Sequence, residues 1–340
     1  MDFFHHFGCF APRCSIYLVT SGNYLFPKVP THTLKSLGVA WVFWAEYINP
    51  MNHVLKNGDI VPESEAMVSL DDIDVTYGYG VYETLKVRKG VLYYPQFHEE
   101  RLFESARILG IDHTLSAGDL EAGLNSLVRS AGEKGQNCNL KVLLLGHTGR
   151  PADLYAFVLN PLYPDRKEVR DGTLVTLFPG ERHFPQAKSL SMLLSTVAFR
   201  QAKALGAYDA LLVNRDNHIT EGTRTNIFYF QPEKDGLGIP KVVYTPPLSQ
   251  VLNGITRRTI IECFKQKSIA TVERPLSVEE IRSDNPPAVF VCSTSTKILP
   301  VKGVIMPEEH HKIDFSIPKE IKILQKWYDE YLAAWSESRL

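Results

Sequence analysis

The stretch AKSLSMLLST, residues 187–196, carries a single charge, Lys188, among small and apolar side chains. Taken alone, the pattern is that of an ordinary solvent-facing lysine near the start of an amphipathic helix. The other reading is a lysine that faces a functional site. The choice between the two depends on what the rest of the chain places around it.

Length, charge and cysteine usage restrict the classes of protein to which the chain can belong. Its 340 residues, 44% of them hydrophobic, predict a globular protein of roughly two domains. The net charge of −1 argues against nucleic acid or an anionic membrane as a partner, because both need a basic surface. Five scattered cysteines without a CxxC pair indicate neither a disulfide framework nor a structural zinc site, and they favour a cytoplasmic location. The pairs His5-His6 and His310-His311 lack the third ligand of a metal site, so no metal is expected.

Residues 1–50 differ in kind from the rest, being rich in aromatic side chains and poor in charge. Their longest apolar run, LGVAWVFWA at 37–45, has nine residues, whereas a membrane-spanning helix needs about 20. The first ten residues, MDFFHHFGCF, do not supply the basic region of a signal peptide. We therefore expect no membrane segment. The extension is either a non-native or over-extended start, or an addition to a family pattern that begins near Met51.

From Met51 onward the hydrophobic pattern becomes regular and mixes strands with helices. The KNGD sequence at 56–59 predicts a hairpin turn, and Lys89-Gly90 predicts a second turn between strands. Apolar periodicity predicts helices at 97–109, 119–130, 196–205, 255–267 and 318–335, and strands at 81–88, 91–94, 141–146, 154–160, 173–178, 209–213, 225–230 and 288–292. Because strict strand–helix alternation is absent, the expected fold class is α+β with mixed sheets.

Four further segments bear on Lys188, and each has an ordinary structural explanation beside a functional one. Glu221 in ITEGTRTNIFYF lies at a strand–turn–strand junction and could be a solvated turn residue. Gly254 in LNGITRRTII precedes a helix whose free N–H groups could bind phosphate or simply end the helix. Thr294 in VCSTSTKILPV lies in a hydroxyl-rich turn of a common kind. Arg101 in FHEERLFESARIL is either a surface ion pair or an inward phosphate clamp.

The order and spacing of these segments resemble the class IV aminotransferases, the pyridoxal-phosphate enzymes of fold type IV. That family includes branched-chain aminotransferases, D-amino-acid aminotransferases and aminodeoxychorismate lyases. The similar segments, in family order, are YGYGVYETLKV, HEERLFESARILGI, AKSLSMLLS, ITEGTRTNIF, LNGITRR and STSTKILPV. The polar, proline-broken stretch NPLYPDRKEV, 160–169, predicts a linker, which we place at 161–169. With the resemblance, this implies a small α/β domain at 51–160 and a large cofactor-binding domain with a barrel-like core at 170–340.

The same resemblance implies a function for individual residues. Lys188 matches the lysine that binds pyridoxal 5'-phosphate covalently, and Glu221 matches the carboxylate that pairs with the ring nitrogen. The matches to the phosphate-binding residues are Arg101, the backbone of Ile255 and Thr256, and the hydroxyl of Thr294, with Asn226 bracing the site. The chemistry suits these residue types, because burial lowers the pKa of a lysine and a neutral amine is needed to attack a carbonyl.

Three residues bear on the substrate. Tyr82 matches a family tyrosine that points into the site, and Arg150 falls on the arginine that some relatives use for a substrate carboxylate. His147 lies nearby and either substitutes for a missing family histidine, where this chain has Ala152, or is simply solvated. The branched-chain reading is weakened because QNCNLKV, 136–142, lacks the Tyr-x-Arg pair of bacterial enzymes, and because Leu193 replaces their tyrosine.

Three hypotheses for the function stay open. The leading one is an aminotransferase that takes an amino group from a D-amino acid or a branched-chain amino acid to a 2-oxo acid, by ping-pong chemistry, in a homodimer. The second is a 4-amino-4-deoxychorismate lyase on the same scaffold. The third, a catalytically silent dimeric scaffold, is disfavoured by the intact set of Lys188, Glu221 and Arg101.

Overall fold

The computed structural model describes residues 53–161, 163–232, 238–306 and 311–339. It begins with the predicted hairpin, β1 (His53–Lys56) and β2 (Asp59–Pro62). Asn57 and Gly58 at the turn both have positive φ values, 49° and 97°. A two-residue turn of this type matches the twist of the paired strands, and Asn-Gly adopts it with little strain. The prediction from KNGD is confirmed.

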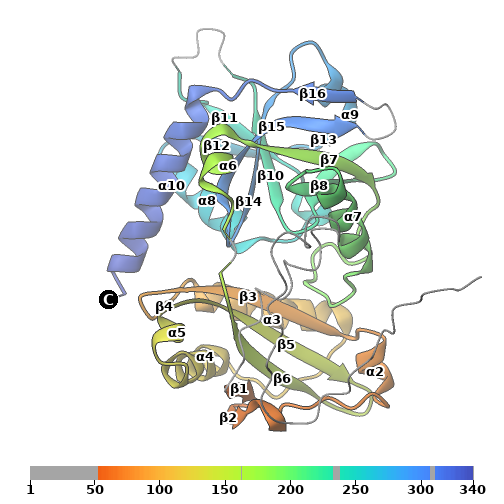
Figure 1. Cartoon of the computed structure of the whole chain (residues 1–340), viewed down its shortest axis with the longest axis vertical. Coiled ribbons are helices and arrows are strands. Elements are labelled where there is room, and N and C mark those ends of the chain that lie inside the picture. The colour runs from red at the N-terminus through yellow and green to blue at the C-terminus, as the bar shows by residue number, and fades with distance from the viewer. Residues whose placement is uncertain (1–52, 162, 233–237, 307–310, 340) are drawn as a thin grey trace, which may run out of the picture. The chain divides into compact units, whose positions relative to one another are not determined.

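A six-stranded sheet occupies the first half of the described chain, and every pairing in it is antiparallel. Its order is β2-β1-β6-β5-β3-β4, drawn from orange to yellow-green in Figure 1. The other strands are β3 (Gly80–Arg88), β4 (Val91–Leu92), β5 (Asn137–His147) and β6 (Arg150–Leu159). Short helical segments accompany them: η1 (Glu63–Glu65), α2 (Ile73–Thr76) and α5 (Glu133–Gln136).

Two longer helices cover one face of this sheet, as the periodicity predicted. They are α3 (Pro95–Leu109) and α4 (Asp119–Ser130), and their leucines pack with Leu85 and Leu140 in a fully buried core. Side chains alternate along a strand, so Tyr82 and Thr84 lie on the opposite face from Leu85. Lys141 is paired directly with Thr84 in the sheet, which places it on that second face as well.

The second half of the chain builds a ten-stranded mixed sheet in the order β12-β11-β10-β14-β15-β7-β8-β9-β13, with β16 paired to β15. Parallel pairs join β7 to β8 and to β15, and β11 to β12, while the other pairs are antiparallel. Together with the first sheet this confirms the α+β class with mixed sheets. The bounds are β7 (Thr173–Pro179), β8 (Asp209–Val213), β9 (His218–Gly222), β10 (Asn226–Phe230), β11 (Val242–Thr245), β12 (Ala270–Glu273), β13 (Leu276–Ser277), β14 (Ala288–Ser293), β15 (Lys297–Met306) and β16 (His311–Asp314).

The helices of this half are α6 (Arg166–Asp171), α7 (Leu193–Ala204), η2 (Leu248–Gln250), α8 (Ile255–Gln266), α9 (Val278–Arg282) and α10 (Lys319–Glu337). Aromatic side chains of the sheet, Phe228 and Phe290, pack with Phe264 of α8 and Tyr328 of α10 in one buried cluster. That packing fixes where α8 begins relative to the sheet.

Two expectations differ from the structure. The segment after Thr294 was expected to be a turn followed by a proline, yet β15 runs through Pro300 for ten residues. The strand tolerates the proline because its pairing with β7 shifts register between Val301 and Gly303, so the missing N–H falls beside an irregular stretch of the ladder. The expected linker 161–169 contains the start of α6, which is stabilised by a capping box between Asp165 and Glu168.

Residues 187–190 are not a helix. They lie alongside β3, where Tyr82 N donates to Lys188 O at 2.9 Å and Leu190 N donates to Gly80 O at 2.9 Å. A Cβ on Gly80 would lie 2.7 Å from the Leu190 side chain and 2.9 Å from Leu144 O, so only glycine permits this approach. Because α7 begins at Leu193, Lys188 is held by the first sheet and not by a helix.

All the described residues belong to one compact unit, and the division into small and large domains stays a prediction. The extension 1–50 lies outside the described residues. Among the described helices, none has the length and apolar character to cross a bilayer.

The core of the first sheet offers a test of the packing. Leu124→Ala removes a fully buried side chain from α4 and should lower the free energy of unfolding by about 2–5 kcal/mol, because a cavity is left in the core. Urea unfolding of the purified protein measures it. The matched change Val169→Ala, at an exposed position of α6, should alter the same quantity by less than about 0.5 kcal/mol. Equal effects from both changes would contradict the assigned core.

Candidate active site

Lys188 lies with its side chain against Tyr82, its ammonium nitrogen 4.5 Å from the centre of the ring. Its backbone N–H donates to the hydroxyl of the buried Ser105 on α3 at 3.0 Å. Lys188 as a whole is half-buried. Burial lowers the pKa of Lys188 to about 7, and the charge of Arg101 adds to this, while Glu83 and Glu221 oppose it. A large fraction of the side chain is therefore a neutral amine near pH 7.

Glu221 is a buried carboxylate, 5% exposed, near the end of β9. One oxygen accepts from Arg182 Nε at 2.8 Å, and the other accepts from Leu252 N at 3.1 Å and Asn226 Nδ2 at 3.5 Å. Burial raises the pKa of Glu221 in spite of the charge of Arg182. The ionised carboxylate is thus incompletely compensated, so an additional N–H donor at this site would stabilise it.

Arg182 was not identified from the sequence, because it lies in an irregular loop with no periodic pattern. Besides Glu221, it donates to Ala187 O at 3.1 Å and to Pro185 O. It therefore connects the buried carboxylate to the residue directly before Lys188. The pKa of Lys188 responds to both Arg182 and Glu221, which places the three charges in one electrostatic environment.

Arg101 is not the surface ion pair that its neighbours in the sequence allowed. It is 9% exposed and makes a bidentate pair with the fully buried Glu83, Nε to Oε1 and Nη2 to Oε2, both at 2.7 Å. His98 Nδ1 lies 2.6 Å from the same carboxylate. Burial alone would raise the pKa of Glu83, but Arg101 and His98 hold it far below its usual range. A glutamate in the buried pattern GVYETLKV was the one sequence signal for this pair.

The N-terminus of α8 lies next to these residues. Arg101 Nη1 donates to Asn253 O at 2.9 Å, and Gly254 follows as an N-cap without a side-chain hydrogen bond. A side chain at Gly254 would collide with Asn226 Oδ1. The first N–H groups of a twelve-residue helix are left without a side-chain cap, which is the arrangement that binds anions.

Ile255, Thr256 and Thr294 line one pocket together, as the sequence predicted for an anion site. Arg101 does not line it, because its guanidinium is engaged by Glu83 and Asn253. The structure thus brings the helix N-terminus and the Thr294 hydroxyl together, whereas Arg101, which was expected on the phosphate, contacts the neighbouring backbone at Asn253. Phosphate binding by these residues stays a prediction.

A second lysine shares the ring of Tyr82. Lys141 Nζ lies 3.4 Å from the ring centre, on the face of the first sheet that carries Thr84. Burial lowers the pKa of Lys141 to about 8, with Tyr82 opposing and Lys188 adding to the shift. The charged residue in the apolar strand NLKVLLL was visible in the sequence but was not interpreted as a site residue.

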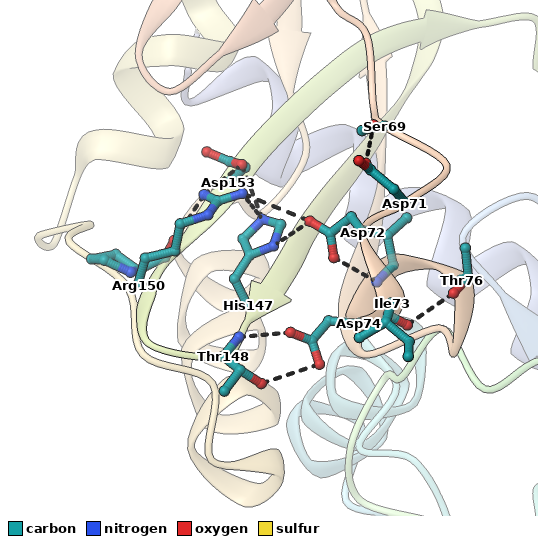
Figure 2. Close-up of polar contacts among 12 residues, drawn as sticks. Ser69, Asp71, Asp72, Ile73, Asp74, Thr76, His147, Thr148, Arg150 and Asp153 are labelled. Carbon is teal, nitrogen blue, oxygen red and sulfur yellow. Dashed lines mark hydrogen bonds and ion pairs between the residues drawn. The ribbon is translucent and has the colours of Figure 1, made fainter.

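His147 and Arg150 form a different cluster, shown in Figure 2. His147 lies between two carboxylates, Nδ1 at 2.8 Å from Asp72 and Nε2 at 3.0 Å from Asp153, and its side chain is 5% exposed, so it is not solvated. Arg150, 52% exposed, also pairs with Asp153 at 2.9 Å. Within the described residues, no hydrogen bond or ion pair joins this cluster to Lys188. No group of three or more His, Cys, Asp and Glu side chains in the described part is placed to hold a metal ion.

The site combines three features: an amine of lowered pKa, a buried carboxylate that can accept a further N–H, and an uncapped helix N-terminus. Together they fit an aromatic nitrogen heterocycle that carries a phosphate, and so define a class of enzyme. Residues 80–304 match the model of the family described as amino-transferase class IV. The chain belongs to this family, and enzymes of this family use pyridoxal 5'-phosphate.

Individual relatives support the same assignment. A D-alanine aminotransferase of Bacillus licheniformis is 28% identical over 74% of this chain and 88% of its own length. A protein of Methanocaldococcus jannaschii named as a branched-chain-amino-acid aminotransferase is 30% identical over 81% of this chain and 98% of its own. A solved structure from Legionella pneumophila, named as a 4-amino-4-deoxychorismate lyase, has a TM-score of 0.66 and 26% identity, covering 79% of this chain and 97% of its own.

The pKa of Lys188 can be tested by chemical labelling. Only the neutral amine reacts with an acylating reagent, so labelling of Lys188 in cofactor-free protein should rise with pH and reach half its maximum near pH 7. Mass spectrometry of the peptide that contains Lys188 measures the rate. In urea-unfolded protein the same lysine should follow its ordinary pKa of about 10.4. Identical pH profiles for the folded and unfolded chain would refute the lowered pKa of Lys188.

Proposed function

We propose that the protein is an aminotransferase that moves an amino group from an amino acid to a 2-oxo acid in two half-reactions. The observation that carries the proposal is the Lys188 amine, with its pKa near 7, in one electrostatic environment with the buried carboxylate of Glu221. A general acid–base catalyst works best when its pKa lies near the operating pH. A silent scaffold protein would have no reason to keep a lysine in such an unfavourable setting.

The proposed cofactor seat follows from the contacts. Lys188 carries the cofactor covalently, and Glu221 holds the proton on its ring nitrogen, supported by Arg182 and Asn226. The phosphate is bound by the N–H groups of Ile255 and Thr256 and by the hydroxyl of Thr294, which line one pocket. Arg101 holds the backbone at Asn253 next to this seat.

Bound pyridoxal phosphate supplies a carbonyl that captures the amino group and a ring that withdraws electrons. The protein residues do the rest. Lys188, as a neutral amine, takes the proton from the Cα of the amino donor. In the second half-reaction it gives a proton to the Cα of the product formed from the 2-oxo acid. Tyr82, between Lys188 and Lys141, forms the wall against which the substrate lies. Glu221 in its buried position keeps the ring nitrogen protonated without solvent competing for that hydrogen bond.

The substrate carboxylate has two sets of candidate ligands in the chain. Lys141 and Tyr82 lie beside Lys188. Arg150 and His147, which the family resemblance suggested as carboxylate ligands, lie in the cluster with Asp72 and Asp153. Half of the Arg150 side chain is exposed there. No hydrogen bond or ion pair among the described residues connects this cluster to Lys188. We therefore infer that Arg150 binds a substrate carboxylate only if it lies next to the active site of a second subunit.

A homodimer is therefore part of the proposal. The segment next to this cluster exposes large apolar side chains: Met67 by 71%, Leu70 by 91%, Ile73 by 59% and Tyr77 by 79%. A cluster of exposed apolar residues marks an interaction site.

The three described cysteines, Cys138, Cys263 and Cys292, are free thiols, and the proposed location is the cytoplasm.

The dimer is tested by sedimentation. Full-length protein should sediment as a dimer, and Leu70→Asp should shift it toward monomer by placing a charge in an apolar contact. Phe184→Asp, a change at another exposed aromatic residue, controls for the added charge. A wild-type monomer with full activity would contradict the proposed dimer.

The lyase is the second candidate, and Lys141 is the observation that favours it. A second cation beside Tyr82 suits a substrate with two carboxylates, as 4-amino-4-deoxychorismate has, better than a neutral amino acid. Aminotransferase and lyase would share every residue of the cofactor seat, so the two are separated only by the reaction.

A spectroscopic experiment decides between them. An aminotransferase keeps the amino group on its cofactor until an acceptor arrives, so an amino acid alone should bleach the visible band of the bound cofactor, and 2-oxoglutarate or pyruvate should restore it. A panel of D- and L-amino acids includes the kinds of substrate named for the D-alanine and the branched-chain-amino-acid aminotransferase relatives. Lys188→Ala should show neither change. If no amino acid bleaches the band, while 4-amino-4-deoxychorismate yields pyruvate, the lyase replaces the aminotransferase.

A further inference from the structure

Lys86 on β3 is a buried cation without an anionic partner. It is 9% exposed, and its ammonium group has no hydrogen bond or ion pair among the described residues; the ammonium nitrogen lies 5.0 Å from the ring centre of Tyr93. Burial lowers the pKa of Lys86 to about 8, and the nearby charges of Arg88 and Lys297 add to this, while Asp329 opposes it weakly. An unpaired buried ammonium is costly, so its retention needs a reason.

Lys86 lines the same pocket as the N-terminus of α8. The pocket is bounded by the first turn of α8 at Ile255 and Thr256, by the hydroxyls of Ser293 and Thr294, and by Lys297. Lys297 is already paired with Asp329 at 2.5 Å, whereas Lys86 is not paired. The pocket thus combines a helix N-terminus, several hydroxyl donors and one uncompensated positive charge.

Tyr94 adds a hydroxyl group to the lining of the pocket. Its side chain is 6% exposed and its buried hydroxyl has no partner in good hydrogen-bond geometry, although Tyr331 lies close enough to interact with it and, together with burial, raises the pKa of Tyr94. The Tyr94 backbone is left-handed, with φ of 52°, which is unfavourable for a bulky residue and is held by stacking on Trp335 at 4.1 Å. In this conformation Tyr94 lines the pocket.

We propose that Lys86 and the Tyr94 hydroxyl bind an oxyanion in this pocket, together with the N-terminus of α8. The oxyanion is the phosphate of the cofactor, which the proposed seat places at this helix N-terminus, or the carboxylate of a substrate that lies beside that phosphate, since both present the same chemistry to an ammonium and a hydroxyl donor. The inference rests on the proposed cofactor seat, but it concerns Lys86 and Tyr94, which have no assigned function in that seat.

The experiment compares full-length holoenzyme with Lys86→Met, Lys86→Arg and Tyr94→Phe. If the anion is the phosphate, Lys86→Met should shift the ³¹P resonance of the bound cofactor and raise its dissociation constant about 10-fold or more, with Lys86→Arg recovering most of the affinity. If the anion is the carboxylate, cofactor affinity and the ³¹P resonance should stay unchanged, and KM for the amino donor should rise about 10-fold with kcat preserved. Tyr94→Phe should give the same kind of change in smaller measure.

Lys203→Met is the matched control, because Lys203 also lies 5.0 Å from a tyrosine ring, that of Tyr208, but does not line the pocket. It should change neither quantity. Lys86→Met with unaltered ³¹P resonance, cofactor affinity and KM would overturn the proposal. The ³¹P resonance and cofactor affinity need no turnover, so a failed aminotransferase assay would leave the phosphate arm readable.

Discussion

The buried ion pair between Glu83 and Arg101 is the interaction on which the site depends. It joins three parts of the fold, because Glu83 belongs to β3, Arg101 to α3, and the same guanidinium holds the backbone of Asn253 before α8. Two charges in the protein interior are stable only when each has its partner in good geometry. The pair therefore fixes the first sheet and the helix N-terminus of the second sheet in one arrangement. Its two charges act on Lys188 in opposite directions, since Arg101 lowers the pKa of Lys188 and Glu83 raises it.

Three lysines, Lys188, Lys141 and Lys86, have lowered pKa values. Burial is the main cause in each case, and the charge of Lys188 lowers the pKa of Lys141 further. The chain as a whole is nearly neutral, so the concentration of positive charge is local. Such a region attracts carboxylates and phosphates, while the neutral fraction of Lys188 provides the base.

Glu221 provides a negative charge that also acts on Lys188. Its contacts with Arg182, Leu252 and Asn226 orient the carboxylate but leave its pKa raised. Asn226 can lie where it does because Gly254 has no side chain. One glycine thus serves both the carboxylate and the open end of α8.

The sequence by itself determined the elements whose signals are local: the hairpin at Asn57-Gly58, the helices α3 and α4, the N-terminus of α8, and the family to which the chain belongs. It also singled out Lys188 and Glu221, through the resemblance of six segments, in order, to one family. The tertiary structure decided what depends on residues far apart in sequence. Glu83 and Arg182 became visible only through their partners, β15 formed across Pro300 because strands on both sides pair with it, and Arg150 was separated from Lys188. The physical reason is that a backbone pattern is set by near neighbours, whereas burial, pKa and ion pairing are set by whatever the fold brings together.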